Sequence, residues 1–205
     1  MSQDHWNTRF SGPDYLFGTA PNAFLQSQAF RLPAAGRALA VADGEGRNGV
    51  WLARQGLQVH AIDFSPVALE KARRLAAGQG VVLETEQADL SQWAWPEAAY
   101  DVVAAIFIQF AGPPLRQQIF SGIRRALRPG GLLLLQGYRP EQLKYRTGGP
   151  SQAENLYTRE LLETAFGDCE ILHLEAHDSV IHEGSGHDGM SALIDLAARK
   201  PHTAA

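Results

Sequence analysis

Apolar and polar positions along the chain follow two periods, one typical of strands and one typical of helices. From Arg37 onward, short apolar runs alternate with longer segments in which apolar residues recur at helical spacing. This order predicts an α/β fold in which helices join the parallel strands of a doubly wound sheet. We expect the first five strands at residues 38–42, 59–62, 81–86, 100–107 and 132–138.

Three amphipathic segments between these strands have the spacing of helices. The best marked one follows Ser65, whose side chain can cap a first turn, and begins with Pro66, which suits that turn. The last one has Thr158 in the capping position. We predict helices over residues 66–77, 113–127 and 157–166.

The last part of the chain departs from this alternation. Residues 169–183 and 190–200 are both typical of strands, and the glycine-rich stretch 184–189 joins them. A connection this short joins antiparallel strands, because parallel neighbours need a long crossover. We therefore predict a mostly parallel seven-stranded sheet that ends in an antiparallel C-terminal hairpin strand.

Length and composition favour a single domain over residues 1–205. The 205 residues are 45% hydrophobic and 20% charged, enough for one sizeable core. Within this domain, segment 1–36 precedes the α/β core at 37–205. It places aromatic residues between turn residues and begins a helix near Pro21. Two interpretations stay open for it, a lid over the carboxyl edge of the sheet and a cap on the core.

Composition also limits the binding partners and the cellular location expected for the protein. No stretch approaches the roughly 18 to 20 apolar residues of a membrane helix, and the first ten residues lack signal-peptide features, so we expect a cytoplasmic protein. The net charge of −4 disfavours nucleic acid. Cys169 alone excludes an internal disulfide, and we expect it to be buried. A monomer and a homodimer are both compatible with the sequence.

The first candidate for chemistry is a glycine turn after the first predicted strand. Gly44, Gly46 and Gly49 form G-x-G-x-x-G at the start of a helix, where backbone N–H groups can face a ligand. Asp63 ends the next strand, where a carboxylate can accept hydrogen bonds from ribose hydroxyls. These features fit a nicotinamide enzyme and a methyltransferase equally well.

Later motifs separate these two readings. Asp89 follows the third predicted strand, Asp101 opens the fourth, and a Pro-Gly-Gly turn precedes the fifth. In this order the motifs resemble the class I S-adenosylmethionine-dependent methyltransferases over nearly the whole chain. The resemblance implies a Rossmann-like fold, S-adenosylmethionine as cofactor, and an enzyme that transfers its methyl group. No Tyr-x-x-x-Lys pair supports a dehydrogenase.

Within that family the chain looks most like the small tellurite-resistance and thiopurine-type methyltransferases. The resemblance is carried by the stretch GEGRN at 44–48, the ending LAARKP, and an opening that contains Trp6, Arg9, Tyr15, Gly18, Pro21 and Asn22. It implies a small-molecule acceptor such as tellurite, selenite or another chalcogen oxyanion, or a thiol.

The resemblance also implies which residues bind the cofactor. The turn 44–48 would cradle the methionine part, Asp63 would hold the ribose, and Asp89 with Leu90 would read the adenine. Arg9 and Tyr15 would approach the methionine end; the alternative is that Arg9 pairs with a surface acid and Tyr15 caps the core. The full set is Arg9, Tyr15, Asp43, Gly44, Glu45, Gly46, Arg47, Asn48, Asp63, Phe64, Ala88, Asp89, Leu90, Ile106, Phe107 and Gln109.

Two positions depart from the family. Most members have an acid and a glycine where this chain has Ala40 and Ala42. The acid usually helps to hold the amino group of the cofactor. Either Asp43 or Glu45 takes over that role here, or cofactor binding is weak.

The acceptor site is expected near the C-terminal hairpin, whose turn would overhang the carboxyl edge of the sheet. His182 and His187 are the candidates for proton removal, since histidine accepts a proton near neutrality. A solvated hairpin turn is the alternative. Substrate-binding candidates are Glu183 in the hairpin and Arg139 and Tyr145 after the fifth strand, where a cationic mouth and a plain solvated loop are both open. No carboxylates suited to magnesium end the fourth and fifth strands, so we expect no metal.

Two other functions remain in play. A short NAD-dependent oxidoreductase can use the same glycine turn. A non-catalytic cofactor-binding module is compatible with the loss of the acid and glycine at Ala40 and Ala42.

Overall fold

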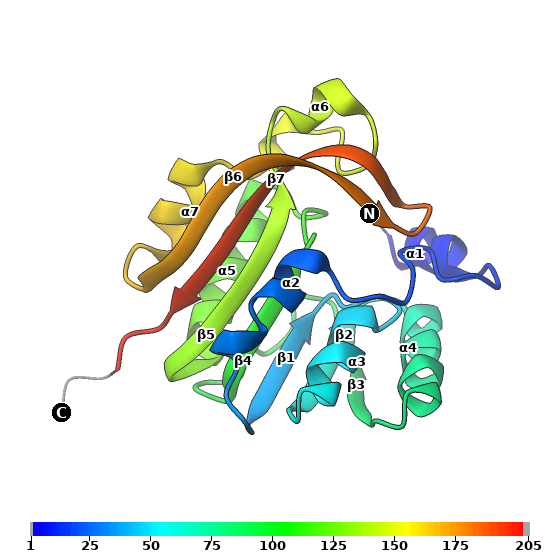
Figure 1. Cartoon of the computed structure of the whole chain (residues 1–205), viewed down its shortest axis with the longest axis horizontal. Helices are drawn as coiled ribbons and strands as arrows, with labels where there is room; N and C mark the ends of the chain where they lie inside the picture. The colour runs from blue at the N-terminus through cyan, green and yellow to red at the C-terminus, as the bar shows by residue number, and fades with distance from the viewer. Residues whose placement is uncertain (1, 203–205) are drawn as a thin grey trace.

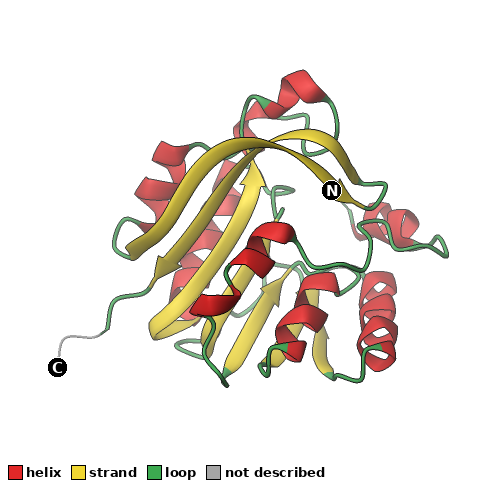
Figure 2. Cartoon of the chain, in the orientation of Figure 1, coloured by secondary structure: helices red, strands yellow, loops and turns green. Residues whose placement is uncertain are grey.

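The computed structural model describes residues 2–202, which are organised around one seven-stranded sheet (Figures 1 and 2). The strand order is β3-β2-β1-β4-β5-β7-β6. β7 runs antiparallel to both of its neighbours, whereas the other pairings are parallel. The predicted fold is thus confirmed. The strands are β1 Arg37–Val41, β2 Gln58–Asp63, β3 Leu83–Gln87, β4 Tyr100–Ile106, β5 Leu127–Tyr138, β6 Glu170–Glu183 and β7 His187–Arg199.

Helices cover both faces of the sheet, as Figure 2 shows. Alternate residues of β1 point to opposite faces: Leu39 and Val41 pack with α5 and α7, whereas Ala38 and Ala40 pack with α2, α3 and α4. This period of two is the reason why the apolar runs predicted buried strands. The helices are α1 Gln3–Phe10, α2 Ala23–Ser27, α3 Arg47–Arg54, α4 Pro66–Gly78, α5 Pro113–Ala126, α6 Gln142–Tyr145 and α7 Arg159–Phe166, and short 3₁₀ turns lie at Ala29–Arg31 and Ala153–Asn155.

The predicted helix caps form as the sequence indicates. The Ser65 hydroxyl accepts a hydrogen bond from the Ala68 N–H, and Thr158 does the same for Leu161. Asn22, one residue after Pro21, caps α2 in the same way. These side chains satisfy N–H groups that a helix start otherwise leaves unpaired.

Three features differ from the sequence predictions. Helix α1 forms where only turns and aromatics were expected, and the Ser2 side chain caps it. β5 already begins at Leu127, because Leu127 pairs with Tyr100 on β4. Cys169 is only half-buried and lies just before β6.

Parallel pairing brings the carboxyl ends of five strands to one edge of the sheet. β6 is antiparallel to β7 and therefore parallel to β5, so its end at Glu183 reaches the same edge. β6 and β7 curve over this edge, and their hairpin approaches the N-terminal segment (Figure 1). There the Gly186 N–H donates to the Leu16 carbonyl at 3.0 Å. The first and last parts of the chain thus close over the same place.

None of the helices in residues 2–202 combines the length and apolar character needed to cross a membrane.

Candidate active site

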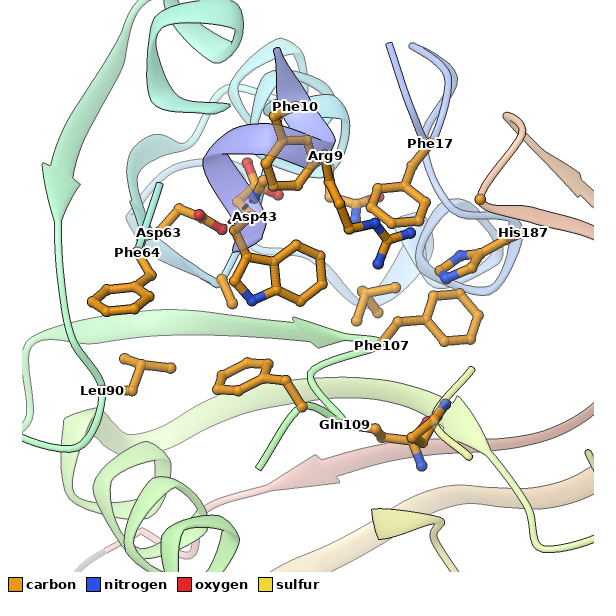
Figure 3. A pocket seen from close by; sticks show the side chains of 18 of the residues that line it. Arg9, Phe10, Phe17, Asp43, Asp63, Phe64, Leu90, Phe107, Gln109 and His187 are labelled. Carbon is orange, nitrogen blue, oxygen red and sulfur yellow. Dashed lines mark hydrogen bonds between the residues drawn. The ribbon is translucent and has the colours of Figure 1, made fainter. Parts of the chain in front are cut away.

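A cavity of about 470 Å³ lies at the carboxyl edge of the sheet. Its volume falls within the range typical of small-molecule sites. Helix α1 contributes Trp6, Arg9 and Phe10 to its wall, which supports the lid interpretation of the N-terminal segment. In Figure 3, Asp63, Phe64 and Leu90 lie toward one end of the cavity, whereas Phe17, Phe107 and His187 lie toward the other. We call these the Asp63 end and the His187 end.

At the Asp63 end, a carboxylate organises the backbone around it. Asp63 accepts hydrogen bonds from the N–H groups of Gly44, at 2.9 Å, and Ser65, at 2.8 Å. Burial raises the pKa of Asp63, and these hydrogen bonds act against that rise. Asp89 lines the same end, and its hydrogen bonds from Ser91 lower its pKa. The cavity wall thus contains two acidic residues, Asp63 and Asp89, together with the apolar Phe64 and Leu90.

The glycine turn serves packing as well as ligand approach. Gly46 has a φ of 89°, and a Cβ there would lie 2.6 Å from the Cβ of Ala72 in α4. A Cβ on Gly49 would lie 2.4 Å from Asp43 Oδ2. The second and third glycines are therefore required by a neighbouring helix and by the Asp43 carboxyl, while Gly44 lines the cavity itself.

Asp43 and Glu45, which flank the first glycine, have different surroundings. Glu45 is directed away from the cavity and binds Lys71 Nζ and the Leu16 N–H, both at 2.7 Å. Asp43 lines the cavity and accepts the Gly49 N–H at 3.1 Å. Burial raises the pKa of Asp43 to about 7. Of the two acids, Asp43 is the one available to a positively charged ligand group.

The His187 end is walled by aromatic rings. The His187 ring centroid lies 4.5 Å from that of Phe17, 4.5 Å from that of Phe107 and 5.6 Å from that of Tyr138. The Arg9 guanidinium lies 5.8 Å from the Phe17 ring centroid. A small ligand group here meets flat apolar surfaces and the cation of Arg9.

Beneath His187, the buried Glu183 carboxylate joins three segments of the chain. Its Oε1 accepts from Asn22 Nδ2 at 2.9 Å, and its Oε2 accepts from Arg47 Nη2 at 2.6 Å. His187 Nδ1 lies 3.9 Å from the same Oε2. Burial alone would raise the pKa of Glu183, but His187 and Arg47 lower it to about 2. The carboxylate is therefore anionic at neutral pH.

His187 itself is neutral at physiological pH. Burial lowers its pKa from 6.5, the charges of Arg47 and Arg9 act in the same direction, and Glu183 opposes them. Nδ1 lies 3.9 Å from the anionic Glu183 Oε2, beyond hydrogen-bond distance. The charge of that carboxylate favours the proton on Nδ1, which leaves Nε2 as the nitrogen that can accept a proton.

The structure brings most of the predicted cofactor residues to the cavity. Tyr15, Glu45 and Gly46 are the exceptions. The Tyr15 hydroxyl donates to the Lys71 carbonyl at 3.2 Å, outside the cavity. The predicted residues that line the cavity are Arg9, Asp43, Gly44, Arg47, Asn48, Asp63, Phe64, Ala88, Asp89, Leu90, Ile106, Phe107 and Gln109.

Of the predicted catalytic and substrate-binding residues, only His187 lines the cavity. The side chain of His182 is 77% exposed and pairs with Asp188. Arg139 and Tyr145 both bind Asp178 on β6, so their side chains are directed away from the cavity. Glu183 lies behind His187 rather than in the wall.

Several wall residues escaped the sequence analysis. Trp6 and Phe10 belong to the helix that was not expected, and Gly148 and Gly149 belong to an irregular loop. Tyr138 ends β5, and the rule that placed Asp63 at the carboxyl edge also applies to it. Within residues 2–202, no cluster of histidine, cysteine, aspartate or glutamate is arranged to hold a metal ion.

Comparison with known proteins agrees with this architecture. Residues 38–131 match a family model described as a methyltransferase domain. The chain is 26% identical to Hemagglutinin 1 of Eikenella corrodens, over 77% of this chain and 52% of that protein. It is 32% identical to tRNA N(3)-cytidine methyltransferase METTL2 of Xenopus tropicalis, over 51% of this chain and 33% of that protein. The chain spans only a third to a half of these relatives.

Solved structures share the fold across almost the whole chain. One, described as "Conversion of a Disulfide Bond into a Thioacetal Group during Echinomycin Biosynthesis", has a TM-score of 0.76 and 18% identity, covering 99% of this chain and 94% of that one. TehB from Haemophilus influenzae has a TM-score of 0.72 and 15% identity, covering 97% and 66%. At these identities the likeness establishes the fold alone.

The match over residues 38–131 and the strand order of the sheet agree on an S-adenosylmethionine-dependent methyltransferase domain. The residues at the Asp63 end suit that cofactor, since a carboxylate is available for the ribose and apolar side chains are available for the adenine. TehB, a structural neighbour, agrees with the sequence resemblance at the level of the fold.

Proposed function

We propose that this domain methylates a small-molecule acceptor, with chalcogen oxyanions and thiols as the classes implied by sequence resemblance. The single observation that carries the proposal is the enclosed His187 end of the cavity, opposite Asp63. The hairpin, the N-terminal segment and the loop at Gly148 surround it, so an acceptor there is shielded from water. An acceptor buried within a large macromolecule does not fit such a space.

The chain's own residues account for the steps that a methyltransferase must support. S-adenosylmethionine, when bound, supplies a methyl group on a positively charged sulfur, and transfer to the acceptor leaves S-adenosylhomocysteine. Asp63 would hold the ribose, and Asp43 would take the place of the missing first-strand acid beside the amino group. The aromatic rings at the His187 end exclude water and orient the acceptor.

His187 removes a proton from acceptors that carry one. The negative charge of Glu183 favours the proton of the neutral imidazole on Nδ1, and Nε2 accepts the acceptor's proton as the bond between the acceptor atom and the methyl carbon forms. An acceptor that is already anionic needs no such step, so His187 then only positions it. This difference makes the contribution of His187 dependent on the acceptor.

Calorimetric titration with S-adenosylhomocysteine tests cofactor binding, with NAD and the Asp63→Ala variant as controls. We expect binding of S-adenosylhomocysteine, a loss of at least tenfold in the variant and no binding of NAD. Binding of NAD instead would support the oxidoreductase alternative.

Product analysis with tellurite, selenite and small thiols tests the reaction. Methylated product from one of these acceptors is expected in the presence of S-adenosylmethionine. Cofactor binding without product from any acceptor would favour the non-catalytic module.

A further inference from the structure

Three buried polar atoms at the His187 end have no hydrogen-bond partner: Nδ1 of His187, Nη1 of Arg47 and the hydroxyl oxygen of Tyr138. The last two belong to N–H and O–H donors, and their residues are 7% and 1% exposed. An unpartnered buried donor costs about 1–3 kcal/mol, so native proteins usually pair such groups or use them for a ligand. Both residues belong to the wall of the cavity.

Arg47 is held so that only half of its guanidinium is engaged. Its Nη2 donates to Glu183, and Asn22 occupies the other oxygen of that carboxylate. Glu183 therefore fixes the guanidinium without using Nη1. A guanidinium fixed in this way is suited to an oxyanion, because its N–H groups have a rigid direction.

Tyr138 is a hydroxyl donor at neutral pH. Burial raises the pKa of its hydroxyl, and the negative charge of Glu183 adds to that effect. Gly148 covers this hydroxyl, since a Cβ on Gly148 would lie 3.2 Å from the oxygen. A glycine loop leaves more room for a ligand atom beside the hydroxyl than any other residue would.

The charge balance at this end also favours an anion. Arg9 and Arg47 supply two positive charges, Glu183 supplies one negative charge that is paired with Arg47, His187 is neutral, and Asp43 is half protonated at neutral pH because its pKa is raised to about 7. One positive charge remains without a partner in the cavity. The walls formed by Phe17, Phe107 and Tyr138 favour a flat apolar body beside it.

We propose that Arg47 Nη1 and the Tyr138 hydroxyl form a subsite for the oxyanion of a small, flat organic acid that this domain takes as acceptor. This inference rests on the proposed methyl transfer and narrows its acceptor. The subsite places the anion against the two donors and the apolar body between the aromatic rings, next to His187.

Benzoate and its neutral counterpart benzamide test the subsite without requiring turnover. Each is titrated into protein saturated with S-adenosylhomocysteine. We expect benzoate to bind at least tenfold more tightly than benzamide, and Tyr138→Phe to weaken benzoate about tenfold while leaving benzamide unchanged. Tyr145→Phe is the matched control, since its hydroxyl binds Asp178 outside the cavity, and it should behave as the wild type.

A second variant keeps the test valid if Tyr138→Phe does not fold. Arg47→Lys keeps the charge next to Glu183 and removes the second guanidinium nitrogen, so it should also weaken benzoate relative to benzamide. The subsite proposal would be overturned if benzoate and benzamide bound with equal affinity. It would also be overturned if neither variant changed the affinity for benzoate. These results would leave the proposed function intact as long as S-adenosylhomocysteine still binds.

Two further arms identify the source of the anion. The compound 5′-methylthioadenosine lacks the amino-acid part of S-adenosylhomocysteine. If Tyr138→Phe weakens the binding of S-adenosylhomocysteine but not that of 5′-methylthioadenosine, the subsite binds the cofactor's own carboxylate and the acceptor assignment is wrong. If selenite displaces benzoate at equal or lower concentration, the flat organic body is unnecessary and the acid class is wrong. If S-adenosylhomocysteine fails to bind the wild type, the proposed function itself falls.

Discussion

Ala42 adopts a backbone conformation that suits glycine better than alanine. Its φ is 48°, in the left-handed region, immediately before the glycine turn. Most members of the resembled family have glycine at this position, and the structure supplies the physical reason. An L side chain in this region costs about 1–2 kcal/mol relative to its usual conformation.

Replacing Ala42 by glycine should therefore stabilise the protein. Glycine releases the backbone strain of the folded state, but it also increases the conformational entropy of the unfolded chain. The net gain in the free energy of unfolding is about 0.5–1 kcal/mol, which raises the midpoint of thermal unfolding by a few degrees. Ala98→Gly is a matched control with a φ of 46° away from the cavity and should show a similar gain. Ala40→Gly in the buried strand β1 should have the opposite sign. A lower midpoint for Ala42→Gly would show that its φ is not a source of strain.

Asp43 provides the second test at the level of single residues. Burial raises its pKa to about 7, so the carboxyl is half protonated at neutral pH before the cofactor binds. The cofactor's ammonium group favours the ionised form. Affinity for S-adenosylhomocysteine should thus be highest above pH 7 and fall by up to tenfold for each pH unit below it.

Calorimetric titrations between pH 5 and 9 measure this dependence. Asp43→Asn should bind more weakly at pH 8 and lose the pH dependence in this range. The assignment fails if the wild-type affinity stays level from pH 5 to 8.

At the level of elements, the β6–β7 hairpin divides its two histidines between different environments. His187 faces the cavity, while His182 on the neighbouring strand is exposed. The register pairs Glu183 with His187 and His182 with Asp188, so each histidine meets a different acid. Sequence alone places both histidines near the edge, and the register decides which one enters the cavity.

His187→Gln should lower kcat about a hundredfold or more for acceptors that must lose a proton, with unchanged affinity for S-adenosylhomocysteine. His182→Gln should leave both quantities near wild type. Because the pKa of His187 lies below 6.5, the wild-type kcat should decline only below that pH. Equal losses in the two variants would contradict the assignment to His187.

The predictability of the elements follows from how local their causes are. Buried strands and capped helices are predictable from local sequence. Leu39 in a strand, and Ser65 and Thr158 at helix starts, have roles that depend on residues near them in the chain. Helix α1 is polar over most of its length and is held by long-range contacts such as the hydrogen bond that the Ser65 hydroxyl donates to Asn7 Oδ1 at 2.6 Å. Contacts of this kind depend on residues far along the chain, which no local pattern records.

The same distinction applies to the site. Asp63 and Gly44 were predictable because the carboxyl edge of a parallel sheet is fixed by topology. The positions of the Glu45 and Arg139 side chains were not predictable, because each forms an ion pair with a residue far along the chain. Glu45 pairs with Lys71, and Arg139 pairs with Asp178. Spacing along the chain cannot show that a charged side chain is already paired.

For the molecule as a whole, cofactor binding and folding are coupled, because the cavity draws on segments from both ends of the chain. S-adenosylhomocysteine at a hundred times its Kd should add about 2.7 kcal/mol to the free energy of unfolding. For a domain of this size that raises the midpoint of thermal unfolding by roughly 5–10 °C. Differential scanning fluorimetry with NAD as control measures the shift. An equal shift with NAD, or none with S-adenosylhomocysteine, would argue against the cofactor assignment.

Because the β6–β7 hairpin follows every other strand in the chain, its contact with Leu16 through Gly186 forms late during synthesis on the ribosome. β7 lies between β5 and β6, and His187 is its first residue, so the seven-stranded sheet and the His187 end are completed only after β7 has been made. The glycine turn and Asp63 are made much earlier. A growing chain therefore contains the residues of the Asp63 end before it can enclose the His187 end, and we expect the proposed methyl transfer to require β7.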